Sequence, residues 1–276
     1  MDKAIIFGVY DFVSFHICKT LLNKGIEVYG IQIEDMEKIQ YLDEKRFEVG
    51  RNANFVEQSL SQLEKSNIQE NPKTTLIFSF FDLYIRNKDD LFQEVTESIL
   101  KYVIENKTYT ELVFILPIQM LRQSEERIYK SFLEQIRSMV KRIQVFYLPS
   151  IYGPWQPASF MFQQAMMLAY QSINISKSER EWTEDTLFVG DAIDCILETM
   201  ETEETGSYLL ESGMKDYWKM CAALLNIEEK LMDSNQLQSF QIKDQIVKIP
   251  LKKITPISQS LLKQKENVEQ LFGKHQ

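Results

Sequence analysis

The first 33 residues alternate between apolar and amphipathic segments in an order that few folds accommodate. Residues 3–7 (KAIIF) and 27–33 (EVYGIQI) are rich in β-branched and aromatic side chains, which is typical of strands. Between them, residues 15–22 carry apolar side chains at helical spacing, and Gly25 follows the end of this helix. A strand, a helix and a second strand within about 30 residues predict a βαβ unit with parallel strands.

The alternation continues to residue 148. Further strands are predicted at 53–56, 75–81, 112–116 and 144–148, and long helices at 89–106 and 124–141. This pattern predicts an α/β fold with a doubly wound parallel sheet (Rossmann-like) of six or seven strands. Beyond it the elements become shorter and more mixed. We therefore expect a Rossmann-like, dinucleotide-binding-type domain over residues 1–155 and a smaller C-terminal α/β lobe, of the substrate-binding type, over 156–276, packed on the sheet's carboxyl edge.

Composition narrows the class of partner. A net charge of −9 and a pI near 5.0 argue against nucleic acid or an anionic membrane as the main partner. Three widely spaced cysteines indicate free thiols, and two histidines at opposite ends of the chain make a metal site unexpected. With neither a signal-peptide pattern nor an apolar run of spanning length, we expect a cytoplasmic protein.

The turn after the first strand departs from the glycine-rich pattern that cradles a pyrophosphate. Gly8, Asp11 and Ser14 stand where the spacing G-x-x-G-x-x-G places three glycines. Ser14 is small enough for the helix to pack on the strand. Asp11 adds a Cβ and a negative charge facing the phosphates. A like charge about 5 Å away costs roughly 3 kcal/mol at an effective dielectric near 20. The turn therefore predicts the fold more strongly than it predicts a dinucleotide cofactor.

Three later segments have the order and spacing of one known family. They are residues 148–155 (LPSIYGPW), 187–194 (LFVGDAID) and 206–213 (GSYLLESG). Together with the opening unit, they resemble the extended short-chain dehydrogenase/reductase family, the NAD-dependent sugar epimerases and dehydratases, over essentially the whole chain. The resemblance implies NAD or NADP as cofactor and a nucleotide or nucleotide sugar as ligand.

The catalytic positions that the resemblance implies hold unusual residues. The family uses a Tyr-x-x-x-Lys pair on the helix after the fifth strand, in which the lysine lowers the pKa of the tyrosine. Lys130 matches the lysine, but Glu126 stands at the tyrosine position. The nearby Ser or Thr of the family is replaced by Leu116, Pro117 and Ile118, which supply no hydroxyl donor.

The cofactor positions are altered as well. Gln32 stands where an acid normally binds the ribose, Ser59 where an acid lies near the adenine, and Phe80 where a small residue leaves room for the pyrophosphate. The candidate cofactor-binding residues are Gly8, Asp11, Phe12, Val13, Gln32, Ser59, Phe80 and Tyr152. These departures predict that NAD or NADP binding is weak or absent.

Three hypotheses follow for the function. The first is a protein with lost catalysis that acts as a binding or regulatory module. The second is a divergent NAD(P)-dependent sugar epimerase or reductase that uses Glu126 and Lys130. The third is a subunit that pairs with an active paralogue.

Assembly into a homodimer is also expected. In the resembled family, the helices after strands four and five often form a four-helix bundle across a twofold axis. In this chain, those helices carry more apolar positions than one sheet-facing stripe requires. The candidate contacts are Phe92, Ile99, Ile128 and Phe132.

Overall fold

The computed structural model describes residues 1–33, 41–63, 74–105, 111–121, 126–140, 142–228, 231 and 245–273, with backbone alone at 89, 90, 92, 105 and 126–130. Within these residues, eight strands form a parallel sheet in the order β10-β9-β6-β5-β4-β1-β2-β3. The strands are β1 (Lys3–Phe7), β2 (Glu27–Gln32), β3 (Phe55–Ser59), β4 (Thr74–Ser79), β5 (Glu111–Pro117), β6 (Ile143–Leu148), β9 (Gly206–Glu211) and β10 (Ile246–Pro250). The predicted doubly wound α/β fold is confirmed.

The expected count of six or seven strands was too low. β9 and β10, from the second half of the chain, extend the sheet beyond β6, so residues on both sides of position 155 share one sheet. One short strand of the second half of the chain does not join this sheet. It is β8 (Thr186–Phe188), which pairs with β7 (Ser150–Tyr152) in a separate two-stranded sheet.

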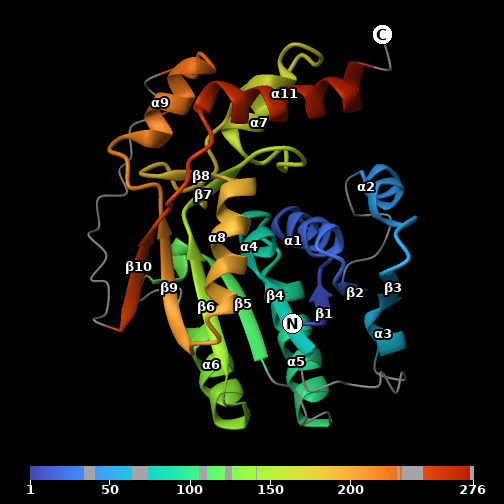
Figure 1. Ribbon diagram of the computed structural model, residues 1–276. Coiled ribbons are helices and arrows are strands. Elements are labelled where there is room, and N and C mark those ends of the chain that lie inside the picture. Colours follow the sequence, from blue (N-terminus) through green and yellow to red (C-terminus); the bar gives the residue numbers. More distant parts are fainter. Residues whose placement is uncertain are drawn as a thin grey trace.

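Helices cover both faces of the sheet and its carboxyl end. They are α1 (Phe12–Asn23), α2 (Leu42–Val49), α3 (Leu60–Leu63), α4 (Phe81–Ile85), α5 (Asp89–Glu105), α6 (Glu126–Met139), α7 (Met161–Met167), α8 (Val189–Glu201), α9 (Tyr217–Leu224) and α11 (Ile257–Phe272), with a 3₁₀ turn η2 (Ile118–Leu121). α1 contacts α8, and α5 contacts α6. Helices α7, α9 and α11 lie together beyond the carboxyl ends of the strands, at the top of Figure 1.

The sheet has one topological switch point. From β1 the chain moves outward through β2 and β3, whereas β4, β5 and β6 extend in the opposite direction. In open parallel sheets, ligands bind in the crevice at the carboxyl ends of the strands where this reversal occurs. Here Gly8 follows β1 and Phe80 follows β4, so these two residues mark the crevice.

Aromatic side chains hold the centre of the sheet to its helices. The rings of Phe7 and Phe78, on neighbouring strands, lie 4.4 Å apart, and that of Phe114 stacks on Phe78 at 5.2 Å. Phe132 of α6 meets the Phe114 ring edge-on, and Ile99 of α5 is wholly buried. The expectation that Ile99 and Phe132 form dimer contacts is therefore wrong, because both side chains belong to the core of a single chain.

The other two expected dimer contacts, Phe92 and Ile128, have side chains outside the described part of the structure.

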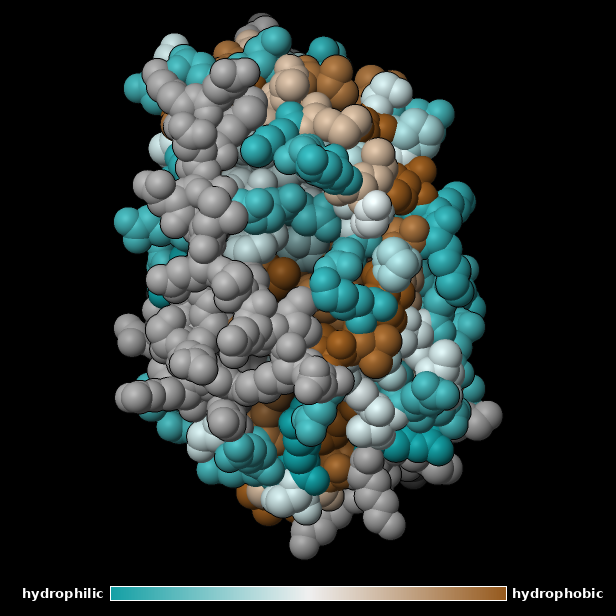
Figure 2. All heavy atoms as spheres, turned by 90° about the vertical axis from the view of Figure 1, so that its left-hand side faces the viewer, coloured by the Kyte–Doolittle hydropathy of each residue, from teal (hydrophilic) through white to brown (hydrophobic). Residues whose placement is uncertain are grey.

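Figure 2 shows the side of the molecule that carries β10, where hydrophobic and hydrophilic side chains are mixed. Val247 on β10 and Leu224 on α9 are both exposed. Within the described residues, a helix long and apolar enough to cross a membrane is not found.

Two isoleucines of α5 test this assignment of the core. Ile99→Ala should lower the free energy of unfolding by about 2–5 kcal/mol, because it leaves a cavity under the sheet. Ile104 is 48% exposed on the same helix, so Ile104→Ala should cost less than about 1 kcal/mol. Urea unfolding of both variants measures the difference, and equal losses would contradict the assignment.

Candidate functional site

The chain makes a sharp turn between β1 and α1. Gly8 has a φ of +65°, in the left-handed region that favours glycine, and its N–H donates to the carbonyl of Ile31 at 2.9 Å. The helix begins at Phe12, three residues earlier than predicted. Asp11 occupies the N-cap position, yet its side chain makes no capping hydrogen bond. Ser14 is buried and donates to the carbonyl of Phe7, which confirms its packing role.

The N-terminus of α1 is capped from a distant part of the chain. Asp82, at the start of α4, is 1% exposed, and its Oδ2 accepts the backbone N–H of Val13 at 3.2 Å. The backbone N–H groups of Val13 and Phe12 lower the pKa of Asp82, against the effect of its burial. Free N–H groups and the helix dipole make such a terminus a binding site for anions, including phosphates. In this protein the anion at that position is a side chain of the chain itself.

Asp11 has a partner of opposite charge. Nη2 of Arg86 lies 3.0 Å from Oδ1 of Asp11, and a Cβ built on Gly8 would lie only 2.4 Å from Oδ2 of Asp11. The carboxylate thus lies over Gly8, in the space that a glycine normally leaves open to the cofactor. The expectation of an uncompensated charge facing the crevice is corrected, because Arg86 neutralises it.

Lys45 of α2 brings a second cation to the same place. Its side chain is 5% exposed, and Nζ donates to the carbonyl of Tyr10 at 2.6 Å. Nζ also lies 5.7 Å from the ring centre of Phe15 and 5.9 Å from that of Trp155. Burial lowers the pKa of Lys45, while the charges of Asp82 and Asp11 act in the opposite direction.

We call Asp11, Lys45, Asp82 and Arg86 the charge cluster. Two carboxylates and two cations balance one another in a buried position at the start of α1. Burial raises the pKa of Asp82, and the charges of Arg86 and Lys45 oppose that rise. Such a cluster stabilises the ionised carboxylates only while all of its members are present.

The expected ribose position, at the end of β2, carries a second polar group. Gln32 donates to Glu57 of β3, which also accepts a hydrogen bond from the hydroxyl of Tyr10 at 2.6 Å and from Nε of Arg46 at 3.1 Å. Glu57 therefore brings a carboxylate to the edge where the resemblance implied one, but it is engaged by its own neighbours. Ser59 instead caps the short helix α3 through its hydrogen bonds with Gln62.

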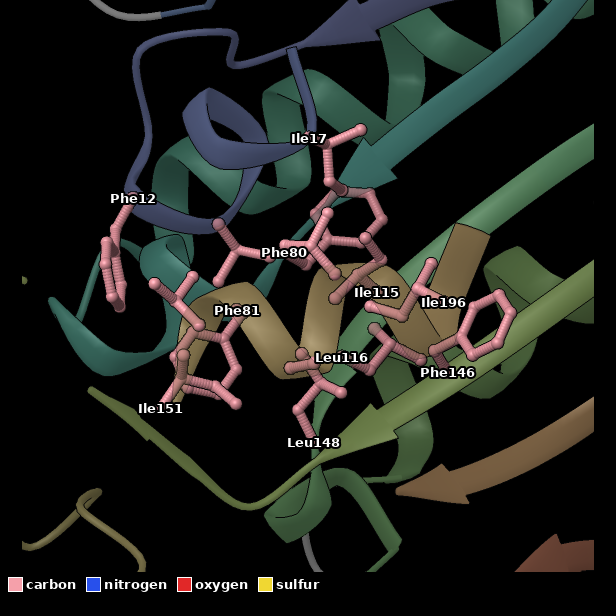
Figure 3. Packing of buried hydrophobic residues seen from close by; sticks show 14 of the residues in the cluster. Phe12, Ile17, Phe80, Phe81, Ile115, Leu116, Phe146, Leu148, Ile151 and Ile196 are labelled. Carbon is pink, nitrogen blue, oxygen red and sulfur yellow. The ribbon is translucent and has the colours of Figure 1, made fainter. Parts of the chain in front are cut away.

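Aromatic side chains fill the crevice beyond the charge cluster. Phe80 and Phe81 follow β4 and are each 1% exposed. The ring of Phe80 lies 6.0 Å from that of Phe132, and Phe81 stacks on Phe160 at 6.2 Å. Figure 3 shows Phe80 and Phe81 in one packed cluster with Ile151. The places that would give a pyrophosphate room thus form part of the core.

The segment between α7 and β8 closes the carboxyl end of β4 and β5. Arg180 donates to the carbonyl of Tyr84 at 2.9 Å and lies over its ring, while Gln119, just after β5, donates to the carbonyl of Arg180 at 2.6 Å. The buried carboxyl of Glu181 accepts the N–H of Met161, and burial raises its pKa to about 8. These contacts hold the segment across the crevice.

Tyr152 ends β7 and lies in the core of the protein. It is wholly buried, and its hydroxyl hydrogen-bonds with Ser260 of α11 at 2.7 Å. The next residues are also held by α11, because Gln264 accepts the N–H of Gly153. Burial raises the pKa of Tyr152. Tyr152 is therefore a packing residue in this structure.

The two candidate catalytic residues lie on one helix, and their catalytic role stays a prediction. Glu126 and Lys130 both lie on α6, the helix after β5, and their side chains lie outside the described part of the structure. Pro117 ends β5, and Leu116 and Ile118 beside it are buried. The place where the family has a hydroxyl donor is apolar.

A groove of about 410 Å³ lies away from the crevice, between α8 and the strands β9 and β10. Its charged lining includes Asp194, Glu198 and Glu204 against Lys252 and Lys253. A mostly acidic lining disfavours phosphates. In the described part of the chain, three or more His, Cys, Asp or Glu side chains are nowhere arranged to hold a metal ion.

Sequence reasoning missed the polar residues that contact one another in and beside the crevice. Asp82 directly follows two phenylalanines at the end of a buried strand, which is a usual place for a ligand-binding side chain. Lys45 and Glu57 carry no comparable signal, because one lies in a polar helix and the other in a short edge strand. Lys45 also stands in a chance match to Tyr-x-x-x-Lys with Tyr41, on the wrong helix.

Known structures share the fold of this chain. UDP-glucuronic acid 4-epimerase from Bacillus cereus, crystallised with NAD, superposes with a TM-score of 0.68 at 15% identity over 98% of this chain and 99% of the epimerase. The Bordetella bronchiseptica enzyme WbmH, in complex with NAD+, gives 0.66 at 16% identity over 99% and 100%. Models of protein families give no match. Neither does any curated protein sequence.

The chain has the fold of the NAD-dependent epimerases and dehydratases. The resemblance in the sequence is thus confirmed at the level of the fold. The residues of the crevice do not fit a dinucleotide bound at the switch point. Its phosphates would need the place of the Asp82 carboxylate, and its path past β4 would need the place of Phe80 and Phe81.

Removing one cation tests the charge cluster. Lys45→Met should lower the free energy of unfolding by about 3–5 kcal/mol at pH 7, because it leaves Asp11 and Asp82 buried with one counter-charge fewer. Lys24, which pairs with Glu201 on the surface, is the matched control, and Lys24→Met should cost less than about 1 kcal/mol. Urea unfolding compares the two. A Lys45→Met variant as stable as the control would show that the cluster is not needed.

Proposed function

We propose that this protein is a catalytically silent relative of the NAD-dependent epimerases and dehydratases, acting as a binding or regulatory module. One observation carries the proposal. Four of the eight expected cofactor-binding residues are buried by the chain's own side chains: Phe12, Val13, Phe80 and Tyr152 are each 1% exposed or less. A residue that binds a cofactor has to be reachable by it.

Opening the crevice would be costly. Each fully buried phenylalanine contributes about 1.5–3 kcal/mol of burial free energy. Displacing both Phe80 and Phe81 to admit a dinucleotide would therefore cost roughly 3–6 kcal/mol. That corresponds to a loss of affinity of about 10²–10⁴.

The chemistry of the site supports the same proposal. A sugar dehydrogenase must move a proton and stabilise charge on a substrate oxygen, and in the resembled family hydroxyl groups do both. Glu126 replaces the tyrosine, and Pro117 lies where the hydroxyl donor would be. Loss of a positioned acid or base typically lowers a rate by 10²–10⁴.

The fold indicates the class of small molecule that such a module would bind. One protein of this fold, MoeE5, is known in complex with UDP-glucuronic acid and NAD. The proposal therefore keeps a nucleotide or nucleotide sugar as the candidate ligand of this chain, bound without turnover.

Calorimetry of the purified protein tests the cofactor part of this proposal. Titration with NAD, NADH, NADP and NADPH should give no saturable binding, because the crevice is filled from within. Thermal unfolding in the presence of each dinucleotide should show no stabilisation. Binding of any of the four in the low micromolar range would overturn the proposal.

A turnover assay tests the catalytic part. Wild type should show no detectable conversion of a panel of nucleotide sugars in the presence of NAD or NADP. Glu126→Gln and Lys130→Ala should leave this result unchanged. Robust turnover by wild type that either substitution abolishes would instead establish the divergent enzyme.

A further inference from the structure

We infer that Asp82 is an intramolecular ligand of the phosphate site: its carboxylate takes the place of a pyrophosphate at the start of α1, with Lys45 and Arg86 as its counter-cations, and so blocks the site to external anions. The inference rests on the proposed function and deepens it. It identifies the group that excludes the cofactor as a side chain of this same chain.

The first argument is the position of the carboxylate. α1 has 12 residues, and Oδ2 of Asp82 accepts the N–H of Val13 in its first turn. The local residue that could cap this turn, Asp11, makes no capping hydrogen bond. The backbone groups that would hold a phosphate are therefore satisfied by a carboxylate 69 positions away in the sequence.

The second argument is the cations around it. Lys45 is almost fully buried and is held by the carbonyl of Tyr10, in the turn that would face a pyrophosphate. Arg86 is the second cation, paired with Asp11. Two cations beside free backbone N–H groups are what a doubly charged phosphate group requires. Here they face two carboxylates instead.

The third argument is competition. Because the fold holds the carboxylate of Asp82 against α1, a free anion has to displace it in order to bind there. The contact is also incomplete, because Oδ1 of Asp82 has no hydrogen-bond partner within the described residues. Removing the carboxylate should therefore leave a usable anion site.

The charge balance sets the expected size of the effect. The charge cluster of two acids and two cations is neutral as it stands. Asp82→Ala leaves one excess positive charge and frees the N–H group of Val13. The double variant Asp11→Ser with Asp82→Ala leaves two excess charges at the same place. Affinity for a polyanion should rise in that order and fall with added salt.

Inorganic pyrophosphate is the probe that tests the inference. Isothermal titration should show no saturable binding to wild type, a gain of at least about tenfold in affinity for Asp82→Ala, and a further gain for the double variant. Asp185→Ala is the matched control, since it removes a carboxylate that also accepts backbone N–H groups, from Thr186 and Ser212, away from α1. This control should gain nothing.

Circular dichroism establishes that each variant is folded. If Asp82→Ala does not fold, Asp82→Asn carries the test, because it keeps the shape of the side chain and removes its charge; it should gain affinity for pyrophosphate over wild type. No gain in any folded Asp82 variant, or an equal gain in Asp185→Ala, would overturn the inference. If wild type binds NAD tightly, the proposed function fails. If wild type ignores NAD and the Asp82 variants ignore pyrophosphate, only this inference fails.

Discussion

The hydrogen bond from the start of α1 to the carboxylate of Asp82 is the contact on which the rest of the site depends. It satisfies backbone N–H groups that would otherwise attract an anion from solution. A buried carboxylate is costly unless cations accompany it, and Arg86 and Lys45 provide them. Lys45 in turn ties α2 to the turn after β1. One internal anion thus organises three separate segments around the place where relatives of this fold bind a cofactor.

The residues of the sheet core and those of the crevice differ in how closely they follow the pattern of the resembled family. β1, β4 and β5 keep the unbroken apolar character of central parallel strands, and their aromatic rings stack across the sheet. At the carboxyl end of β4, Phe80 and Phe81 extend this core into the crevice. The rings of Phe81 and Phe160 stack on each other beside the crevice.

The sequence was sufficient to predict those elements whose structure depends on local residues. Strand β1 was predicted to the residue, and β4, β5 and β6 within two residues, because each is a short apolar run bounded by polar positions. The sequence was insufficient to predict features that depend on residues far apart in the chain. β9 and β10 join the sheet only through tertiary pairing, and the start of α1 is defined by Asp82, far along the chain. The altered residues Asp11 and Phe80 correctly marked the crevice as unusual, but pairing with Arg86 could not be seen from spacing.

A crystal structure grown in the presence of a high concentration of NAD tests the central claim most directly. The account predicts that the carboxylate of Asp82 remains within hydrogen-bonding distance of the backbone N–H of Val13, that Arg86 remains on Asp11, and that no dinucleotide is present at the start of α1. Density for a pyrophosphate at that position, with Asp82 displaced from the helix and Phe80 or Phe81 moved aside, would contradict it.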